Sequence, residues 1–194
     1  GPDMLAYTYD CGTGKVEKHL YGEGLYQGEE IKERIIPGMM YDDVYGGRRL
    51  NPSLCCKLIK KELFTRVTKS VKDRITLGED ALVTYPAVCL AKSIFICNKA
   101  LYHYRANASS CTHTYPLERV TEVRAFQAHM MRLFDEMGML DRFRYEIENY
   151  VRSLLAMMVR NWYKIEFSPV LFSFPFHLIP RGARVMIYGA GNVG

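Results

Sequence analysis

The sequence lacks an apolar run long enough to cross a membrane as a helix. Its longest such run, residues 169–180, falls well short of the ~20 residues that a membrane helix needs, and three prolines interrupt it. No stretch has the pattern of a secretory signal. We therefore expect a cytoplasmic location, with peripheral contact to a membrane surface as the form of membrane association to consider.

Metal-binding spacings are absent as well. The six cysteines include no C-x-x-C pair, and the adjacent Cys55 and Cys56 are poorly placed for a disulfide. The five histidines include no H-E-x-x-H motif. We expect reduced, mostly buried thiols and no metal ligand set within this chain.

A strong charge of one sign is also missing. The chain has 26 basic and 21 acidic residues, which gives a formal net charge of +5. That balance is compatible with an anionic ligand but too weak to indicate a nucleic-acid partner, so we expect none. Apolar residues make up 48% of the 194 residues, enough to build the core of one good-sized domain with an appendage.

Hydrophobic periodicity predicts a mixed α/β chain that ends in a helical hairpin. Strands are expected over residues 4–21, as a pair around a turn at 10–14, and over residues 93–105. Helices are expected over residues 29–40, which Pro37 disturbs, over 54–71, and over 79–92, which contain Pro86. A helix over 117–137 ends at Gly138, and the helix after it has Phe143, Ile147, Val151, Leu154, Met158 and Trp162 on one face.

The segment 54–71 would carry basic side chains on one helical face. We expect this face to be solvated rather than to form a phosphate site. Its members are Lys57, Lys60, Lys61, Arg66 and Lys69.

Residues 77–113 contain the groups that point most clearly to chemistry. The acidic pair Glu79 and Asp80 opens a helix, whose N-terminus favours ionised carboxylates. Such a carboxylate can accept a proton from an attacking alcohol, and a following arginine with hydroxyl groups can donate hydrogen bonds to a leaving phosphate. Adjacent helical residues point about 100° apart, so the two acids cannot share one role. The alternative is that both acids only cap the helix.

Three segments in this region follow one another in a recognisable order, residues 51–67, 78–105 and 106–113. Together they resemble the acceptor-side half of bacterial family 2 glycosyltransferases, which have the GT-A fold. The resemblance covers roughly residues 45–115. It rests on Lys57-Leu58, on Glu79-Asp80, on the strand end Leu101-Tyr102-His103-Tyr104-Arg105, and on Ser109-Ser110-Cys111-Thr112.

This resemblance implies an inverting transfer of sugar from a nucleotide-diphosphate sugar to an acceptor hydroxyl, in surface polysaccharide synthesis. Asp80 would be the general base and Glu79 its neighbour and orienter. Substrate-binding roles, mainly toward the donor diphosphate, are expected for Arg105, Ser109, Ser110, His113 and Lys57. The expected partners are the sugar donor and a saccharide or lipid-linked acceptor.

Three features depart from the family pattern. Cys55-Cys56 stands where many relatives have a tryptophan, and no Q-x-x-R-W signature follows the Ser-rich loop. The nucleotide-binding front half with its D-x-D metal motif is missing, and Asp42-Asp43, in a Gly-rich loop, does not replace it. A divalent metal, magnesium or manganese, is therefore expected only in an intact enzyme, and this chain alone is expected to be inactive.

The chain ends in a G-x-G-x-x-G turn at residues 189–194, after an apparent strand. A dinucleotide site needs the helix that follows such a turn, because its N-terminus holds the pyrophosphate. We interpret this stretch as the start of a truncated Rossmann-like domain and expect a piece of a longer protein. The expected divisions are 1–115, part of a GT-A domain; 116–180, a helical extension; and 181–194, the truncated domain.

Two other functions remain open on the sequence. The helical pair could serve a non-catalytic interaction module, in which Glu79 and Asp80 are caps. A dinucleotide-dependent oxidoreductase, read from the terminal glycines, is the weaker alternative. An isolated half-domain should also expose an apolar face, which favours homo-oligomers or domain swapping.

Overall fold

The computed structural model describes residues 1–10, 12, 16–17, 19–71, 75–105, 119–163 and 184. These residues form a mixed α+β structure, as the sequence predicted. Five strands make one sheet in the order β2-β1-β5-β3, and β4 pairs with β1 on the edge that β2 also uses. The strands are β1 (Met4–Asp10), β2 (Val16–Glu17), β3 (Gly24–Gln27), β4 (Lys57–Ile59) and β5 (Ser93–His103).

The sheet is built around β1, which runs parallel to β5 and antiparallel to its other partners. Met4 and Ala6 of β1 are buried beside Ile94 and Ile96 of β5, which are their register partners. This alternation gives the sheet one apolar face toward the helices. The expected strand pair within residues 4–21 is confirmed as β1 and β2, and the one or two strands expected over 93–105 are the single strand β5.

Short helical turns connect the strands. The π-helix η1 (Ile31–Ile35) ends before Pro37, which cannot donate the hydrogen bond that would extend it. The predicted helix over 54–71 is wrong in its first third. A 3₁₀ turn, η2 (Leu54–Cys56), leads into strand β4, and only then does α1 (Lys61–Thr68) begin. Pairing with β1 fixes residues 57–59 as a strand, since tertiary hydrogen bonds override helical spacing.

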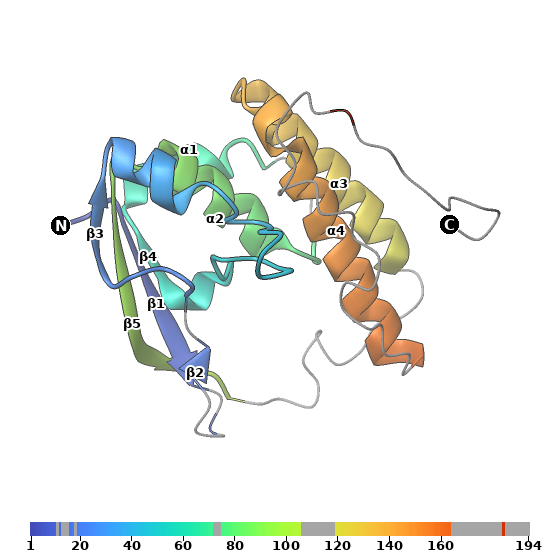
Figure 1. The fold of residues 1–194 in the computed structure, drawn as a ribbon, viewed down its shortest axis with the longest axis horizontal. Coiled ribbons are helices and arrows are strands. Elements are labelled where there is room, and N and C mark those ends of the chain that lie inside the picture. Colours follow the sequence, from blue (N-terminus) through green and yellow to red (C-terminus); the bar gives the residue numbers. More distant parts are fainter. Residues whose placement is uncertain are drawn as a thin grey trace.

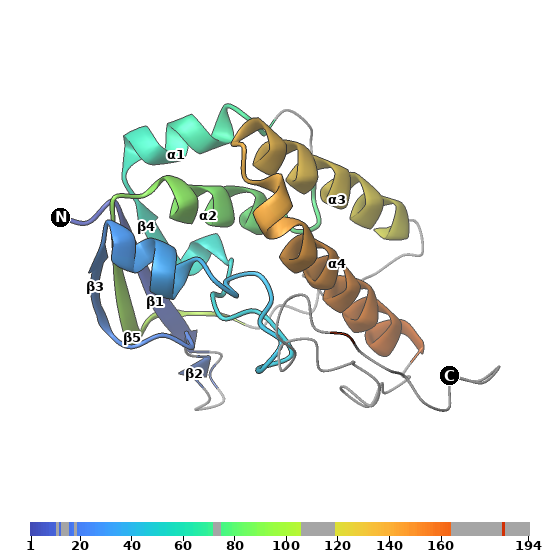
Figure 2. The same cartoon turned by 45° about the horizontal axis from the view of Figure 1, so that its top comes forward.

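Helix α2 (Glu79–Leu90) is the central element of the fold. Eight consecutive residues, Ala81 to Val88, are buried, so this helix is covered on all sides. Pro86 lies inside it, as expected from the sequence. Figures 1 and 2 show the elements around it: the sheet lies on one side of α2, and the later helices lie on the other.

Helices α3 (Arg119–Glu136) and α4 (Leu140–Tyr163) form the predicted hairpin. Gly138, at φ +67°, ends α3. The amide of Met139 donates to the Phe134 carbonyl and the Gly138 amide donates to the Asp135 carbonyl. This is the Schellman pattern, which satisfies carbonyls that a helix end would otherwise leave open.

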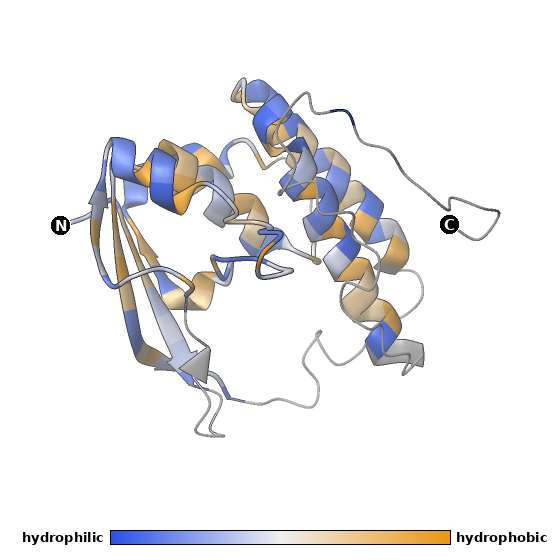
Figure 3. Cartoon of the chain, in the orientation of Figure 1, coloured by the Kyte–Doolittle hydropathy of each residue, from blue (hydrophilic) through white to orange (hydrophobic). Residues whose placement is uncertain are grey.

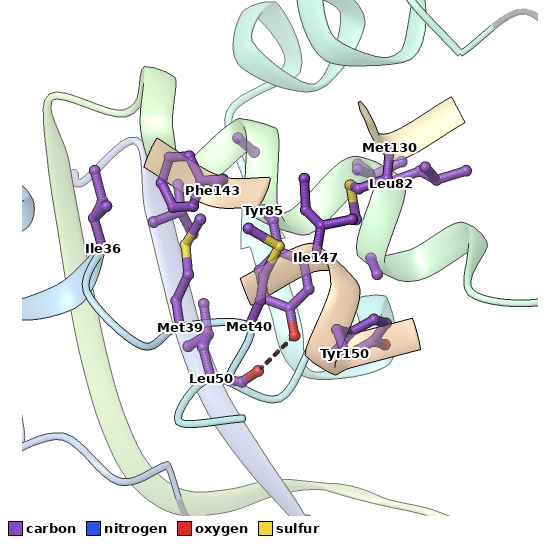
Figure 4. Packing of buried hydrophobic residues seen from close by; sticks show 14 of the residues in the cluster. Ile36, Met39, Met40, Leu50, Leu82, Tyr85, Met130, Phe143, Ile147 and Tyr150 are labelled. Carbon is purple, nitrogen blue, oxygen red and sulfur yellow. Dashed lines mark hydrogen bonds between the residues drawn. The ribbon is translucent and has the colours of Figure 1, made fainter. Parts of the chain in front are cut away.

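One hydrophobic cluster joins the hairpin to the rest of the molecule. It runs from β1 and β5 through α2 to α3 and α4, and the expected stripe residues Phe143, Ile147 and Val151 belong to it. Figure 4 shows Leu82 and Tyr85 of α2 among Met39, Met40 and the side chains of α3 and α4. The apolar colouring of Figure 3 likewise gathers where these elements face one another.

A carboxylate on α4 adds a polar tie between the hairpin and the loop after η1. Glu146 accepts hydrogen bonds from the backbone amides of Gly38 at 3.0 Å and Met40 at 3.1 Å. Burial raises the pKa of Glu146, while these amides act in the opposite direction. The contact bridges more than 100 residues of sequence and fixes how the hairpin sits on the loop.

Two glycines with positive φ allow a matched test of this packing. A Cβ on Gly78, at φ +79°, would lie 2.8 and 2.9 Å from ring atoms of Phe126, whereas a Cβ on Gly138 would meet nothing within 4 Å. Each change to alanine should cost about 1–2 kcal/mol for the left-handed backbone. Gly78→Ala should cost about 1–3 kcal/mol more, because the ring must move.

Equilibrium urea unfolding of the two variants measures the difference. Equal losses of unfolding free energy would mean that Phe126 does not pack against the start of α2 as described.

Candidate functional site

Asp80 lies in the first turn of α2, where the helix meets the turn before β4. The N-cap residue of α2 is Gly78, which has no side chain to cap the helix. The side chain of Asp80 is half-buried, while that of its neighbour Glu79 is exposed. The two acids therefore face different surroundings, as expected for adjacent residues on a helix.

The carboxylate of Asp80 is bound from outside its own helix. The Leu54 amide and the Ser53 hydroxyl act on it as donors that favour its charged form. Burial raises the pKa of Asp80 above its ordinary value of 3.8, although both hydrogen bonds and the nearby Lys57 ammonium work to lower it. Desolvation thus outweighs the groups that favour the charged form, and the carboxylate is a stronger base than one in water.

Lys57 approaches the same turn from the other side. Its side chain is buried, with 6% exposed, and its ammonium donates to the carbonyl oxygens of Asn51 at 2.7 Å and Ser53 at 3.1 Å. A third contact joins Nζ to the sulfur of Cys56 at 3.2 Å. Burial lowers the pKa of Lys57, and the carboxylate of Asp80 acts to raise it. The prediction of a solvated face is therefore wrong for Lys57, because β4 turns this side chain inward.

Further along, α2 binds the turn through its buried hydroxyl groups. Thr84 Oγ1 donates to the Pro52 carbonyl at 2.6 Å, and the Tyr85 hydroxyl donates to the Leu50 carbonyl at 3.2 Å. The latter bond is the dashed line in Figure 4. Together with the contacts of Lys57, these bonds satisfy each carbonyl from residue 50 to residue 53.

Helix α4 contributes Tyr150 to this region. Its ring meets the Tyr85 ring edge-on, with 5.7 Å between centroids. Burial raises the pKa of Tyr150 to about 12, Arg48 acts to lower it, and the carboxylates of Asp80 and Glu79 act to raise it further. The acidic pair of α2 and the phenol of α4 therefore lie close enough to interact electrostatically.

The other predicted site residues are only partly placed. Arg105 follows the end of β5 and is exposed. Ser109, Ser110 and His113 lie outside the described residues, as does the glycine-rich stretch 189–194. The structure brings Lys57 and Asp80 together around one turn, and the remaining donor-binding assignments stay predictions.

Sequence reasoning missed several members of this cluster. Ser53 and the Leu54 amide act on Asp80 because the chain turns toward α2 at this point. A pattern of side chains in the sequence does not reveal such a turn. Asn51 gives a local signal: its Oδ1 accepts from the Ser53 amide at 2.9 Å, the turn typical of Asn before Pro-Ser. Tyr150, three residues after Ile147, extends the apolar stripe of α4 and could have been found from that spacing.

The described residues do not offer a metal site. In this part of the chain no three histidine, cysteine, aspartate or glutamate side chains gather as a metal ion would need. A divalent metal in an intact enzyme stays a prediction. Among the same residues, no helix combines the length and apolarity needed to cross a bilayer.

Comparison of the chain with protein-family models, with curated proteins and with solved structures finds no match.

The raised pKa of Asp80 has a definite consequence for stability. A carboxyl whose folded pKa exceeds 3.8 stabilises the fold fully below that value, and this contribution is lost as pH rises through the folded pKa. The free energy of unfolding of the native chain, relative to Asp80→Asn, should therefore fall as pH rises from about 3 to about 7.

Asp3 provides the control of opposite sign. The Lys60 side chain and the Lys92 amide lower its pKa through hydrogen bonds, so its contribution is present above 3.8 and lost as pH falls. Relative to Asp3→Asn, the native chain should gain stability as pH rises. Urea unfolding across this range measures both differences, and two slopes of the same sign would contradict the burial of Asp80.

Proposed function

We propose that this chain is the acceptor-side part of an inverting glycosyltransferase, and that Asp80 is its general base. The observation that supports this most directly is the environment of Asp80. The carboxylate is half-buried and held by two donors, and its pKa is raised by desolvation. A base gains strength from a raised pKa as long as it stays ionised at the working pH.

The proposed reaction transfers one proton and one glycosyl group. The acceptor oxygen forms a bond to the anomeric carbon while the bond from that carbon to the nucleotide diphosphate breaks on the opposite face. The acceptor proton passes to a carboxylate oxygen of Asp80 and then to solvent. The bond electrons leave with the diphosphate, which exposed Arg105 would help to neutralise.

The contacts of Asp80 favour this role over helix capping alone. A capping carboxylate binds amides of its own helix and usually has a lowered pKa. Asp80 instead binds residues 53 and 54, which come from a different element, and its pKa is raised. A helix-stabilising acid would gain nothing from this burial, whereas a base would.

The proposal extends to fold and substrates. The described sheet with α2 behind it would be the acceptor-side portion of a GT-A domain. Its partners would be a nucleotide-diphosphate sugar and a saccharide or lipid-linked hydroxyl, as expected for synthesis of a surface polysaccharide. The order of the segments around Lys57, Glu79 and Arg105 supports this extension.

Asp80→Asn tests the proposal, because it keeps the size and polarity of the side chain and removes the base. In the longest polypeptide that contains this chain, turnover of nucleotide-diphosphate sugars with hydroxyl acceptors should fall about a hundredfold or more. Glu79→Gln is the matched control: it removes one charge at the neighbouring exposed position and should cost far less.

Thermal melts of both variants are needed beside the rate measurements. A folded Asp80→Asn enzyme that turns over at the native rate would refute the assignment of the base. Equal losses in the two variants would instead indicate a general electrostatic effect of the helix start.

A further inference from the structure

A polar cavity of about 310 Å³ lies among β3, η1 and the chain segments around residues 20–22 and 49. It shares no residue with the site around Asp80, and the proposed function does not use it. Besides Leu20 and Gly22, its lining consists of two tyrosines, two arginines and one glutamate. These are Tyr21, Tyr26, Glu33, Arg34 and Arg49.

The two tyrosine rings hold the two arginines. Both tyrosines are buried, and each hydroxyl donates to a backbone carbonyl, at 2.8 Å for Tyr21 and at 2.9 Å for Tyr26. The guanidinium carbon of Arg49 lies 4.7 Å from the centre of the Tyr21 ring, and that of Arg34 lies 5.0 Å from the centre of the Tyr26 ring. A guanidinium that lies on a ring can still bind an anion through its N–H groups.

Neither arginine is strongly neutralised by the protein. Among the carboxylates that the structure describes, none forms an ion pair with Arg49, whose nitrogens reach two carbonyl oxygens at 3.4 and 3.5 Å. Arg34 pairs with Glu30 at 3.5 Å, and more than half of each side chain is exposed. Such a surface pair contributes little. Each guanidinium has five donors, so both retain donors for a further acceptor.

Glu33 restricts what the further acceptor can be. Its side chain is exposed and also lines the cavity, and an ionised carboxylate only accepts hydrogen bonds. Glu33 would repel a bare anion but bind hydroxyl groups. A molecule with an anionic group for Arg34 and Arg49 and with hydroxyl groups for Glu33 satisfies all three residues. The volume, at the small end of the range for ligand sites, suits a single sugar ring with one phosphate.

We propose that this cavity binds a phosphate group that carries hydroxyl groups, as a sugar phosphate does. The phosphate would lie against Arg34 and Arg49, and the hydroxyl groups would donate to Glu33. Free sugar phosphates and the headgroup of phosphatidylglycerol share this chemistry, and the experiments below separate the two sources. The inference does not rest on the proposed function.

Arg34→Met is the main test, because an exposed side chain can be replaced without loss of the fold. NMR titrations of the 194-residue chain with glucose-6-phosphate measure the affinity from the amide signals of residues around the cavity. Removal of the charge-assisted hydrogen bonds should weaken binding about tenfold or more. The matched control is Lys32→Met. It also removes one cation and one surface ion pair from η1, and 59% of each side chain is exposed, but Lys32 does not line the cavity. Its effect should be about twofold or less.

Glu33→Gln tests the contact to the hydroxyl groups. Loss of the negative charge should strengthen the binding of inorganic phosphate, because a repulsion is removed. Glucose-6-phosphate should gain less, since its hydroxyl groups lose a charged acceptor. The preference for glucose-6-phosphate over inorganic phosphate should therefore fall in this variant, and an unchanged preference would overturn the role of Glu33.

Vesicles identify the source of the phosphate. Binding to phosphatidylglycerol vesicles that Arg34→Met removes and Lys32→Met keeps would assign the site to a lipid headgroup. Binding of glucose-6-phosphate without binding to these vesicles would assign it to a free ligand. The proposal would be overturned if neither bound, if Arg34→Met and Lys32→Met had equal effects, or if glucose without phosphate bound as tightly as glucose-6-phosphate.

Discussion

The burial of α2 from Ala81 to Val88 is the constraint on which the rest of the structure depends. A helix covered on all sides needs apolar surfaces around it, which the sheet supplies on one side and α3 and α4 on the other. The turn that packs on it is buried from residue 50 to residue 52. Thr84 and Tyr85 therefore bind the Pro52 and Leu50 carbonyls, since buried carbonyls without partners are costly.

This constraint explains why two charged groups lie in the interior. Helix α2 binds two of the four carbonyls of residues 50–53, and the ammonium of Lys57 binds the other two, those of Asn51 and Ser53. A buried cation is costly unless an anion is near, and the carboxylate of Asp80 acts to raise the pKa of Lys57. The raised pKa of Asp80 indicates that this site is held at some cost in stability, a common feature of functional sites.

The helical hairpin takes part in the same arrangement. Glu146 of α4 fixes the loop at Gly38 and Met40, and Tyr150, one turn further along, packs on Tyr85 beside the acidic pair. Helix α4 thus contacts the loop after η1 through Glu146 and lies near Asp80 through Tyr150. The hairpin and the sheet region share one core. A change in how α4 packs would therefore also move the residues around Asp80.

The sequence by itself determined the elements whose signals are local: the strands at 4–10 and 93–103, the α2 helix with its acidic start, and the hairpin that Gly138 divides. It also placed the acidic pair Glu79 and Asp80 at a helix start, and the family resemblance then pointed to Asp80. Only the tertiary structure decided that residues 57–59 are a strand, since the hydrogen bonds of β1 outweigh helical spacing there. That pairing turns Lys57 from solvent into the core. The turn at residues 50–54 also lies beside Asp80, some 26 positions further along the chain, and no periodic pattern encodes an approach made through a backbone turn.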